Sequence, residues 1–130
     1  MKKDMIRVKS EHRCQFIDIT TQVVNKLCNL GINDGLITLF VPHTTAGVMI
    51  NENVDPEVVR DIAMWLERTV PDNLNYQHLE GNSPAHIKSV LIGSSVNIGV
   101  VNGEILLGTW QGIFFCEFDG PRTREVYIIS

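Results

Sequence analysis

Histidines are the first candidates for chemistry in this chain, because imidazole is a common metal ligand and is the side chain that titrates near neutral pH. His12 stands among charged residues and is expected to be solvated, whereas His43, His78 and His86 fall at boundaries of predicted elements or in a polar loop. If these three side chains converge, they would hold a zinc ion with a fourth position open, as in catalytic sites. The alternative stays open that His43 is a hydrogen-bonded residue at a strand end and His86 a half-exposed helix residue.

Two carboxylates near the C-terminus, Glu117 and Asp119, alternate with apolar residues and are therefore predicted to leave the same face of one strand. Two acids on one face are costly unless they meet a cation, a hydrogen-bond donor or water. Arg122 follows the strand, and its guanidinium group could bind a phosphate through two hydrogen bonds. The simpler alternative is a set of surface ion pairs between these acids and Arg122 or Arg124, which would contribute little energy.

Polar side chains also follow directly after a strand that should be buried. They are Asn51, Glu52, Asn53 and Asp55, and the alternative stays open that Asp55 is only the N-cap of the next helix and Asn53 only a turn former. Glu80 and Asn82 directly precede another predicted helix, whose free N–H groups form a natural site for an anion.

The elements that position these residues follow from the spacing of apolar residues and from capping and turn signals. Helices are predicted from a cap at Thr20 or Thr21 to Gly31, from Asp55-Pro56 to Pro71, and from Ser83-Pro84 to Gly93. Strands are predicted at residues 6–8, 15–19, 36–41, 46–50, 96–101, 104–107, 111–118 and 124–129. Hairpins outnumber strand-helix-strand units, the clearest being a type I′ turn at Asn102-Gly103. The predicted fold class is therefore α+β, a single compact domain over residues 1–130 with a mainly antiparallel β-sheet system and about three helices.

The composition excludes several classes of function. The 130 residues, 44% of them hydrophobic, suffice for one domain with a real core, and the net charge of −4 leaves no basic stripe for nucleic acid. The apolar runs are far shorter than the roughly 18 residues that a membrane span needs. The N-terminus does not resemble a secretory signal, so a cytoplasmic location is expected. Three cysteines, Cys14, Cys28 and Cys116, are an odd number among apolar neighbours and are predicted to be reduced core residues.

Three blocks of the sequence resemble the signature blocks of the YjbQ family, which is also labelled secondary thiamine-phosphate synthase. They are VPHTTAGVMINENVD at residues 41–55, HLEGNSPAHI at 78–87 and LGTWQGIFFCEFDGPR at 107–122. The resemblance covers essentially the whole chain. It departs from the family at Ser83-Pro84, where Ala-Asp is more frequent; this change keeps a helix cap but removes a carboxylate.

The resemblance implies a homotrimer and a small-metabolite enzyme with weak thiamine phosphate synthase activity. That reaction joins a pyrimidine pyrophosphate to a thiazole phosphate, and a divalent metal, zinc or magnesium, is expected to assist it. His43, Glu117 and Asp119 are the expected catalytic residues, and His43, His78 and His86 the expected metal ligands. The expected substrate-binding residues are Asn51, Asn53, Asn82, Trp110, Gln111 and Arg122. The competing interpretation is a non-catalytic trimeric module that binds a metal ion or a small anion.

Overall fold

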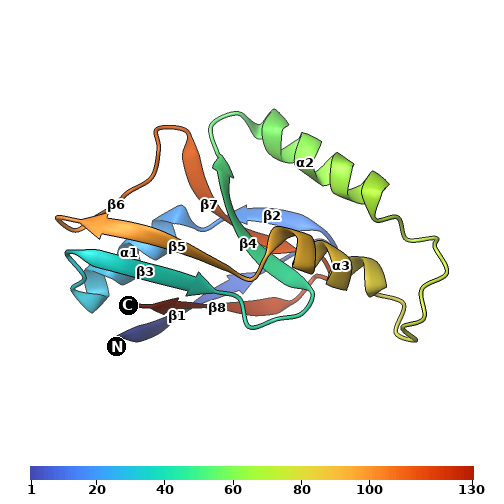
Figure 1. Cartoon of the computed structure of the whole chain (residues 1–130), viewed down its shortest axis with the longest axis horizontal. Helices are drawn as coiled ribbons and strands as arrows, with labels where there is room; N and C mark the ends of the chain where they lie inside the picture. The colour runs from blue at the N-terminus through green and yellow to red at the C-terminus, as the bar shows by residue number, and fades with distance from the viewer.

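Two antiparallel sheets and three helices make up the fold, which the computed structural model describes for all residues from 1 to 130 (Figure 1). The five-stranded sheet has the order β1 (Lys3–Lys9), β8 (Thr123–Ile129), β3 (Gly35–Phe40), β5 (Ser95–Val101) and β6 (Glu104–Ile105). The three-stranded sheet has the order β2 (Gln15–Asp18), β7 (Gln111–Glu117) and β4 (Ala46–Glu52). The helices are α1 (Thr20–Leu30), α2 (Pro56–Thr69) and α3 (Ser83–Ile92). The predicted α+β class with a mainly antiparallel sheet system is confirmed.

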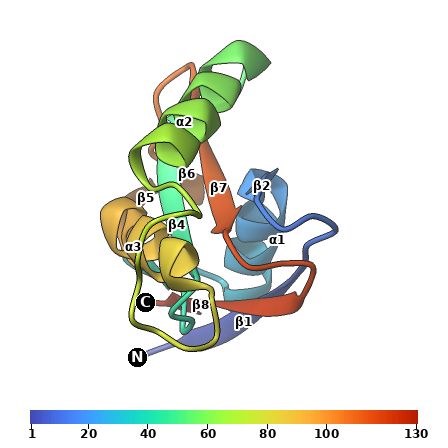
Figure 2. The same ribbon diagram turned by 90° about the vertical axis from the view of Figure 1, so that its right-hand side faces the viewer.

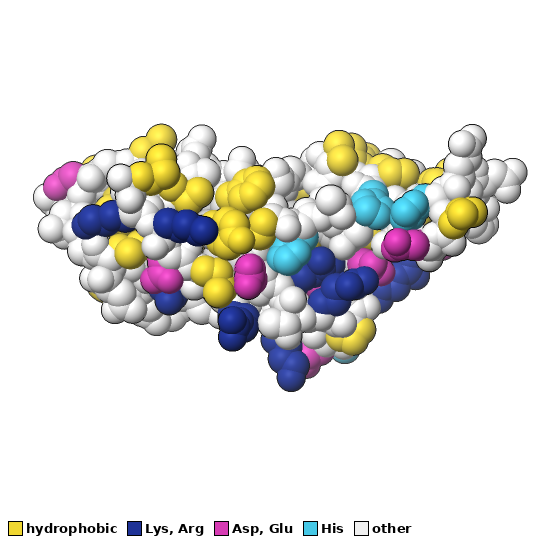
Figure 3. Space-filling view, turned by 90° about the horizontal axis from the view of Figure 1, so that it is seen from below, with side chains coloured by type: hydrophobic (Ala, Val, Ile, Leu, Met, Phe, Trp, Pro, Cys, Tyr) yellow, Lys and Arg dark blue, Asp and Glu magenta, His cyan; other side chains and the backbone are white.

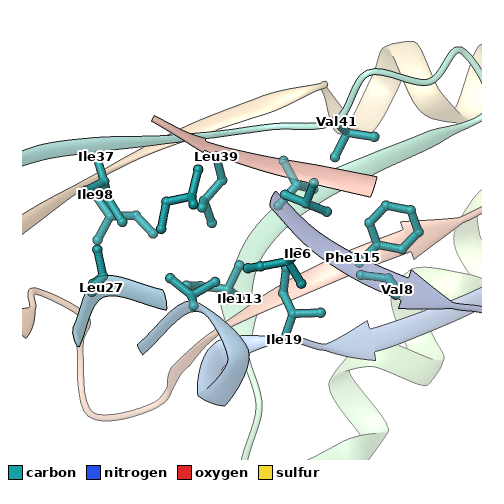
Figure 4. Close-up of a cluster of buried hydrophobic side chains, with 14 of the residues drawn as sticks. Ile6, Val8, Ile19, Leu27, Ile37, Leu39, Val41, Ile98, Ile113 and Phe115 are labelled. Atoms are coloured by element: carbon teal, nitrogen blue, oxygen red, sulfur yellow. The ribbon is translucent and has the colours of Figure 1, made fainter. Parts of the chain in front are cut away.

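The main core lies between the inner faces of the two sheets and is closed by α1 (Figure 4). Strands β1, β3, β5 and β8 send alternate residues into it, as the period of two in a strand requires. Strand β7 is buried on both faces: Ile113 and Phe115 enter this core, while Phe114 and Cys116 pack with Leu66 of α2. Figure 2 shows α2 and α3 on one side of the three-stranded sheet and α1 on the other. A polar side chain at the end of β7 is therefore carried into the interior.

The helix ends match the predicted signals in part. Asp55 caps α2 as predicted, with its carboxylate accepting the N–H of Glu57 at 3.0 Å and Pro56 as the first helical residue. The predicted threonine cap of α1 is wrong, because the cap residue is Ile19 and Thr20 is already helical. The carboxylate of Asp18 takes the capping role instead, since its Oδ1 accepts the N–H of Thr20 at 2.9 Å.

The third helix begins at Ser83, one residue before the proline, and Asn82 stands at its cap position. The side chain of Asn82 makes no capping hydrogen bond; it donates to Asp119 instead. The predicted type I′ turn is confirmed, because Asn102 and Gly103 both have positive φ angles, 52° and 77°.

The connection between β7 and β8 passes from one sheet to the other, so these two strands are not neighbours. Residues 70–82 form neither helix nor strand, so His78 lies in a loop as predicted. The prediction of three buried cysteines is wrong, because only Cys116 is buried. Cys28 lies beside the buried Leu27 on the outer side of α1, and Cys14 is exposed before β2.

None of the helices has the length and apolar character to cross a membrane.

The cap of α2 gives a test of the local structure. Asp55→Ala is expected to lower the free energy of unfolding by about 1 kcal/mol, because it removes an acceptor for a first-turn N–H group. Urea unfolding measures this change, with Asp61→Ala on the exposed side of the same helix as the control. An equal effect of the two substitutions would contradict the capping role.

Candidate functional site

A polar pocket of about 410 Å³ opens where the segment before β4, the loop 70–82, the start of α3 and the β7–β8 connection meet. We call it the histidine pocket. Its lining residues are Pro42, His43, Thr44, Thr45, His78, Glu80, Asn82, His86, Asp119, Arg122 and Arg124. Figure 3 shows histidine, basic and acidic side chains gathered on this face of the molecule. Three histidines that are far apart in the sequence are thus brought to one pocket.

A buried ion pair between Glu117 and Arg124 lies behind the histidine pocket, and Arg124 is the partner that lines it. The guanidinium of Arg124 donates from Nε to Glu117 Oε1 at 2.9 Å and from Nη2 to Glu117 Oε2 at 2.5 Å. Nη2 also donates to the hydroxyl of Thr45 at 2.8 Å, and Ser10 donates to Glu117 Oε1 at 2.7 Å. Both partners of the pair are buried. The alternative of a surface ion-pair set is therefore wrong for Glu117, because the end of β7 lies inside the fold.

The carboxylate of Glu117 is fully committed to this network. Burial alone would raise the pKa of Glu117, but the hydrogen bonds from Arg124, Ser10 and the amide of Asp119 outweigh it and lower the pKa. Glu117 does not line the histidine pocket. It therefore serves to position Arg124 and is not placed to act as a catalytic base.

The imidazole of His43 is oriented by the backbone of the adjacent strand β8. Its Nε2 accepts the N–H of Glu125 at 3.0 Å, which assigns the proton of the neutral ring to Nδ1. Burial, followed by the nearby positive charge of Arg124, lowers the pKa of His43. His43 is therefore a neutral hydrogen-bond donor through Nδ1 at neutral pH.

Asp119, another residue that lines the histidine pocket, is fixed between two donors. Its Oδ2 accepts from Asn82 Nδ2 and from Arg122 Nη2, both at 3.0 Å. Burial raises the pKa of Asp119, but these hydrogen bonds and the positive charge of Arg122 lower it by more than burial raises it. The pKa of Asp119 therefore lies below its ordinary value. Asp119 is ionised at neutral pH and is a weak base.

His78 and His86 contact each other, with ring centroids 5.2 Å apart and nearly perpendicular planes. His78 Nε2 lies 3.9 Å from the carboxylate of Glu80. No group of three or more His, Cys, Asp or Glu side chains is arranged to hold a metal ion. The expected set of three histidine ligands therefore does not fit as it stands, since the Nε2 of His43 is already occupied.

Four of the expected substrate-binding residues lie at the other end of β4 and β7. Asn51 pairs with Gly112 and Gln111 with Glu52 in the sheet, about 20 Å along the strand from the histidine pocket at roughly 3.3 Å per residue. Asn53 donates to Asp18 at 3.1 Å, and Trp110 is exposed. Among the expected substrate-binding residues, the structure places only Asn82 and Arg122 in the histidine pocket.

Sequence reasoning missed Ser10 and Thr45 as parts of the network behind the histidine pocket, and it considered Arg124 only as a partner in a surface ion pair. Ser10 and Glu117 are separated by 107 residues, and Thr45 and Arg124 by 79. No local spacing could reveal these contacts, because the crossing from one sheet to the other creates them.

Comparison with known proteins agrees with this fold. The UPF0047 protein YjbQ-like family matches residues 4–129. The chain belongs to this family. Among its relatives, UPF0047 protein MJ1081 of Methanocaldococcus jannaschii is 51% identical over 122 residues, covering 94% of this chain and 88% of that protein. UPF0047 protein YugU of Bacillus subtilis is 47% identical over 124 residues, covering 95% of this chain and 94% of that protein.

Solved structures of the family share the same architecture. A protein of the yjbq/upf0047 family from Clostridium acetobutylicum superposes with a TM-score of 0.94 at 50% identity, covering 97% of this chain and 98% of that chain. A hypothetical protein from Aeropyrum pernix K1 superposes with a TM-score of 0.94 at 38% identity, covering 99% of this chain and 97% of that chain.

The buried ion pair predicts a pH-dependent contribution to stability. The folded pKa of Glu117 lies below its ordinary value of 4.5, so the contribution is complete above that pH and is lost as the pH falls through the folded pKa. Glu117→Gln should therefore cost about 3 to 5 kcal/mol at neutral pH, because Arg124 stays buried without a counter-ion.

Urea unfolding of both proteins at neutral and acid pH measures this effect. The difference between wild type and Glu117→Gln should shrink in acid. The exposed pair of Glu57 and Arg60 supplies the control, since Glu57→Gln is expected to change stability by about 0 to 1 kcal/mol. A pH-independent difference for Glu117→Gln would contradict the account.

Proposed function

We propose that the histidine pocket binds a small phosphorylated metabolite and catalyses group transfer on it, with thiamine phosphate formation as the reaction to test first. In that reaction the bond between the pyrimidine methylene carbon and a pyrophosphate oxygen breaks, and the carbon bonds to the nitrogen of a thiazole phosphate. Such a step needs hydrogen-bond donors for the leaving pyrophosphate and a negative group near the developing pyrimidine cation.

The observation that carries the proposal is the free edge of a buried guanidinium. Arg124 is 5% exposed and lines the histidine pocket, and its hydrogen bonds use only Nε and Nη2. Nη1 has no partner in the protein. Arg124 Nη1 is not one of the buried atoms that lack a partner, so it is accessible from the pocket. An oriented donor that reaches the pocket supports recognition of an anionic oxygen, because the ion pair with Glu117 has already fixed the guanidinium.

Two further donors support the same assignment. Arg122 donates from Nη2 to the carboxylate of Asp119 and from Nε to the backbone carbonyl of Asp119. Its Nη1 is left free. His43 offers its Nδ1 proton. We propose that these groups share the pyrophosphate, and that the ionised Asp119 stabilises the positive charge that develops on the pyrimidine.

A divalent metal, zinc or magnesium, is a separate part of the proposal. His78 and His86 are the two imidazoles in mutual contact, and we propose them as its ligands in place of the set of three. Imidazole nitrogens suit zinc better than magnesium. When bound, the metal would neutralise charge on the phosphates.

A non-catalytic module is the second candidate, and one observation favours it. Asp119, which lines the histidine pocket, and Glu117, which lies behind it, both have lowered pKa values, so neither is poised as a base at neutral pH. A module that captures a small anion would use the same arginines and need no base.

The enzymatic proposal predicts thiamine phosphate from purified protein, the two precursors and magnesium. His43→Ala should lower the rate at least about a hundredfold, because it removes a donor to the leaving group. His12→Ala is the control, since His12 does not line the histidine pocket. Wild-type turnover no faster than buffer would reject the enzyme, and stabilisation by pyrophosphate without turnover would favour the binding module.

The metal proposal is tested by elemental analysis of protein purified without a histidine tag. Zinc content is expected to fall in His78→Ala and in His86→Ala and to stay unchanged in His43→Ala. Wild-type protein without zinc, or loss of zinc in His43→Ala, would reject this ligand assignment.

We also propose that three copies of the chain assemble through the outer face of the five-stranded sheet. Exposed apolar residues gather there: Leu36 lies opposite Gly99 on β5, Leu106 covers Gly99, and Phe40 stands beside Tyr127. An exposed apolar patch of this kind is typical of an interface. Figure 3 shows hydrophobic side chains on the same face as the histidines.

Light scattering is expected to give the mass of a trimer for the wild-type chain. Leu36→Glu should reduce the mass to that of a monomer, because it places a charge in the apolar contact. Leu74→Glu, at an exposed apolar residue of the loop 70–82, is the control and should leave the mass unchanged. A monomeric wild type would reject the assembly.

A further inference from the structure

A second, mostly apolar cavity lies between α2, β2 and α3, away from the histidine pocket. Its volume is about 180 Å³. Phe16, Leu66 and Phe118 form apolar walls, while Lys88, Glu67 and Cys14 form a polar end. Phe118 faces this cavity, whereas the next residue, Asp119, lines the histidine pocket. The two sites therefore lie on different sides of the chain at the end of β7.

Lys88 is the unusual feature of this cavity. Its side chain is 2% exposed, although a buried ammonium group is costly unless it is paired and hydrogen-bonded. An ammonium group has three N–H donors. Its single oxygen partner is Glu67 Oε1 at 2.5 Å, and its other contact is the weak acceptor Cys14 Sγ at 4.0 Å. Lys88 therefore has donor capacity that the protein does not satisfy.

The size of the cavity limits what it can hold. An apolar cavity of about 150 Å³ is large enough to bind benzene. The cavity beside Lys88 is slightly larger, so it has room for one ring with a small polar substituent. Pockets for drug-sized ligands are larger, roughly 300 to 1,000 Å³.

The charges around the cavity select a neutral ligand. Glu67 already balances the charge of Lys88, and Arg60 is paired with Glu57 at 2.7 Å. A carboxylate ligand would place a second negative charge beside Glu67 in an apolar surrounding, which is unfavourable. A carbonyl oxygen would accept a free N–H of Lys88 without adding charge.

We propose that this cavity is a second ligand site, which takes an uncharged single-ring compound with a carbonyl oxygen. The ring lies between Phe16, Leu66 and Phe118, and the oxygen accepts from Lys88. This site does not depend on the function proposed for the histidine pocket.

Benzamide, benzoate and toluene are suitable probes, and backbone amide shifts of the full chain in NMR spectra report their binding. In the wild type, benzamide is expected to shift the resonances of cavity residues and to bind at least tenfold more tightly than benzoate. Toluene, which lacks the oxygen, should also bind more weakly than benzamide.

Glu67→Gln provides the sharpest test, because Glu67 is half exposed and its replacement leaves the walls intact. The variant removes the counter-ion of Lys88, so the order should reverse and benzoate should bind more tightly than benzamide. An unchanged order would overturn the proposal.

Ala63→Trp tests the location, since Ala63 lines the cavity and a large side chain there would fill it. Benzamide binding should be lost in this variant. Met64→Trp, at the exposed neighbouring position of α2, is the matched control and should bind benzamide as the wild type does. The proposal would be overturned if benzamide failed to shift the amide resonances of the wild type, or if it still shifted them in Ala63→Trp.

Discussion

The buried ion pair between Glu117 and Arg124 is the interaction on which the candidate site depends. Glu117 ends β7 in one sheet and Arg124 lies in β8 of the other, so their contact joins the two sheets where the chain crosses between them. Ser10 and Thr45 complete the hydrogen bonds of the pair. A buried pair of this kind is tolerated only when such partners satisfy it, which explains why the network is so complete.

The same pair determines how the histidine pocket presents its charges. It fixes Arg124 with Nη1 free, and the next residue, Glu125, holds His43 through its backbone N–H. The positive charge of Arg124 also contributes to the lowered pKa of His43. The orientation of both residues thus follows from one strand, β8, which packs on the core through Val126 and Ile128. Rigid strands position these donors more precisely than a loop would.

Much of the fold was predictable from the sequence, because its signals are local. Proline after Asp55 predicted the start of α2, and Asn102-Gly103 predicted the hairpin between β5 and β6. The convergence of three histidines was a hypothesis that spacing alone could not support. The exposure of Glu117 was predicted wrongly. An acid that alternates with apolar residues indicates an exposed side chain only in a strand that has an exposed face. Strand β7 has none, since the core covers one face and α2 and α3 cover the other.

We propose that the guanidinium of Arg124 bridges Glu117 and a bound phosphate. Calorimetric titration of pyrophosphate into wild type and Arg124→Lys tests it directly. Lysine keeps the charge and can pair with Glu117, but it lacks the second arm that a guanidinium offers. The account predicts that the wild type binds pyrophosphate and that Arg124→Lys binds it at least about tenfold more weakly while it remains folded. Equal affinity in the two proteins, or no binding by the wild type, would contradict the claim.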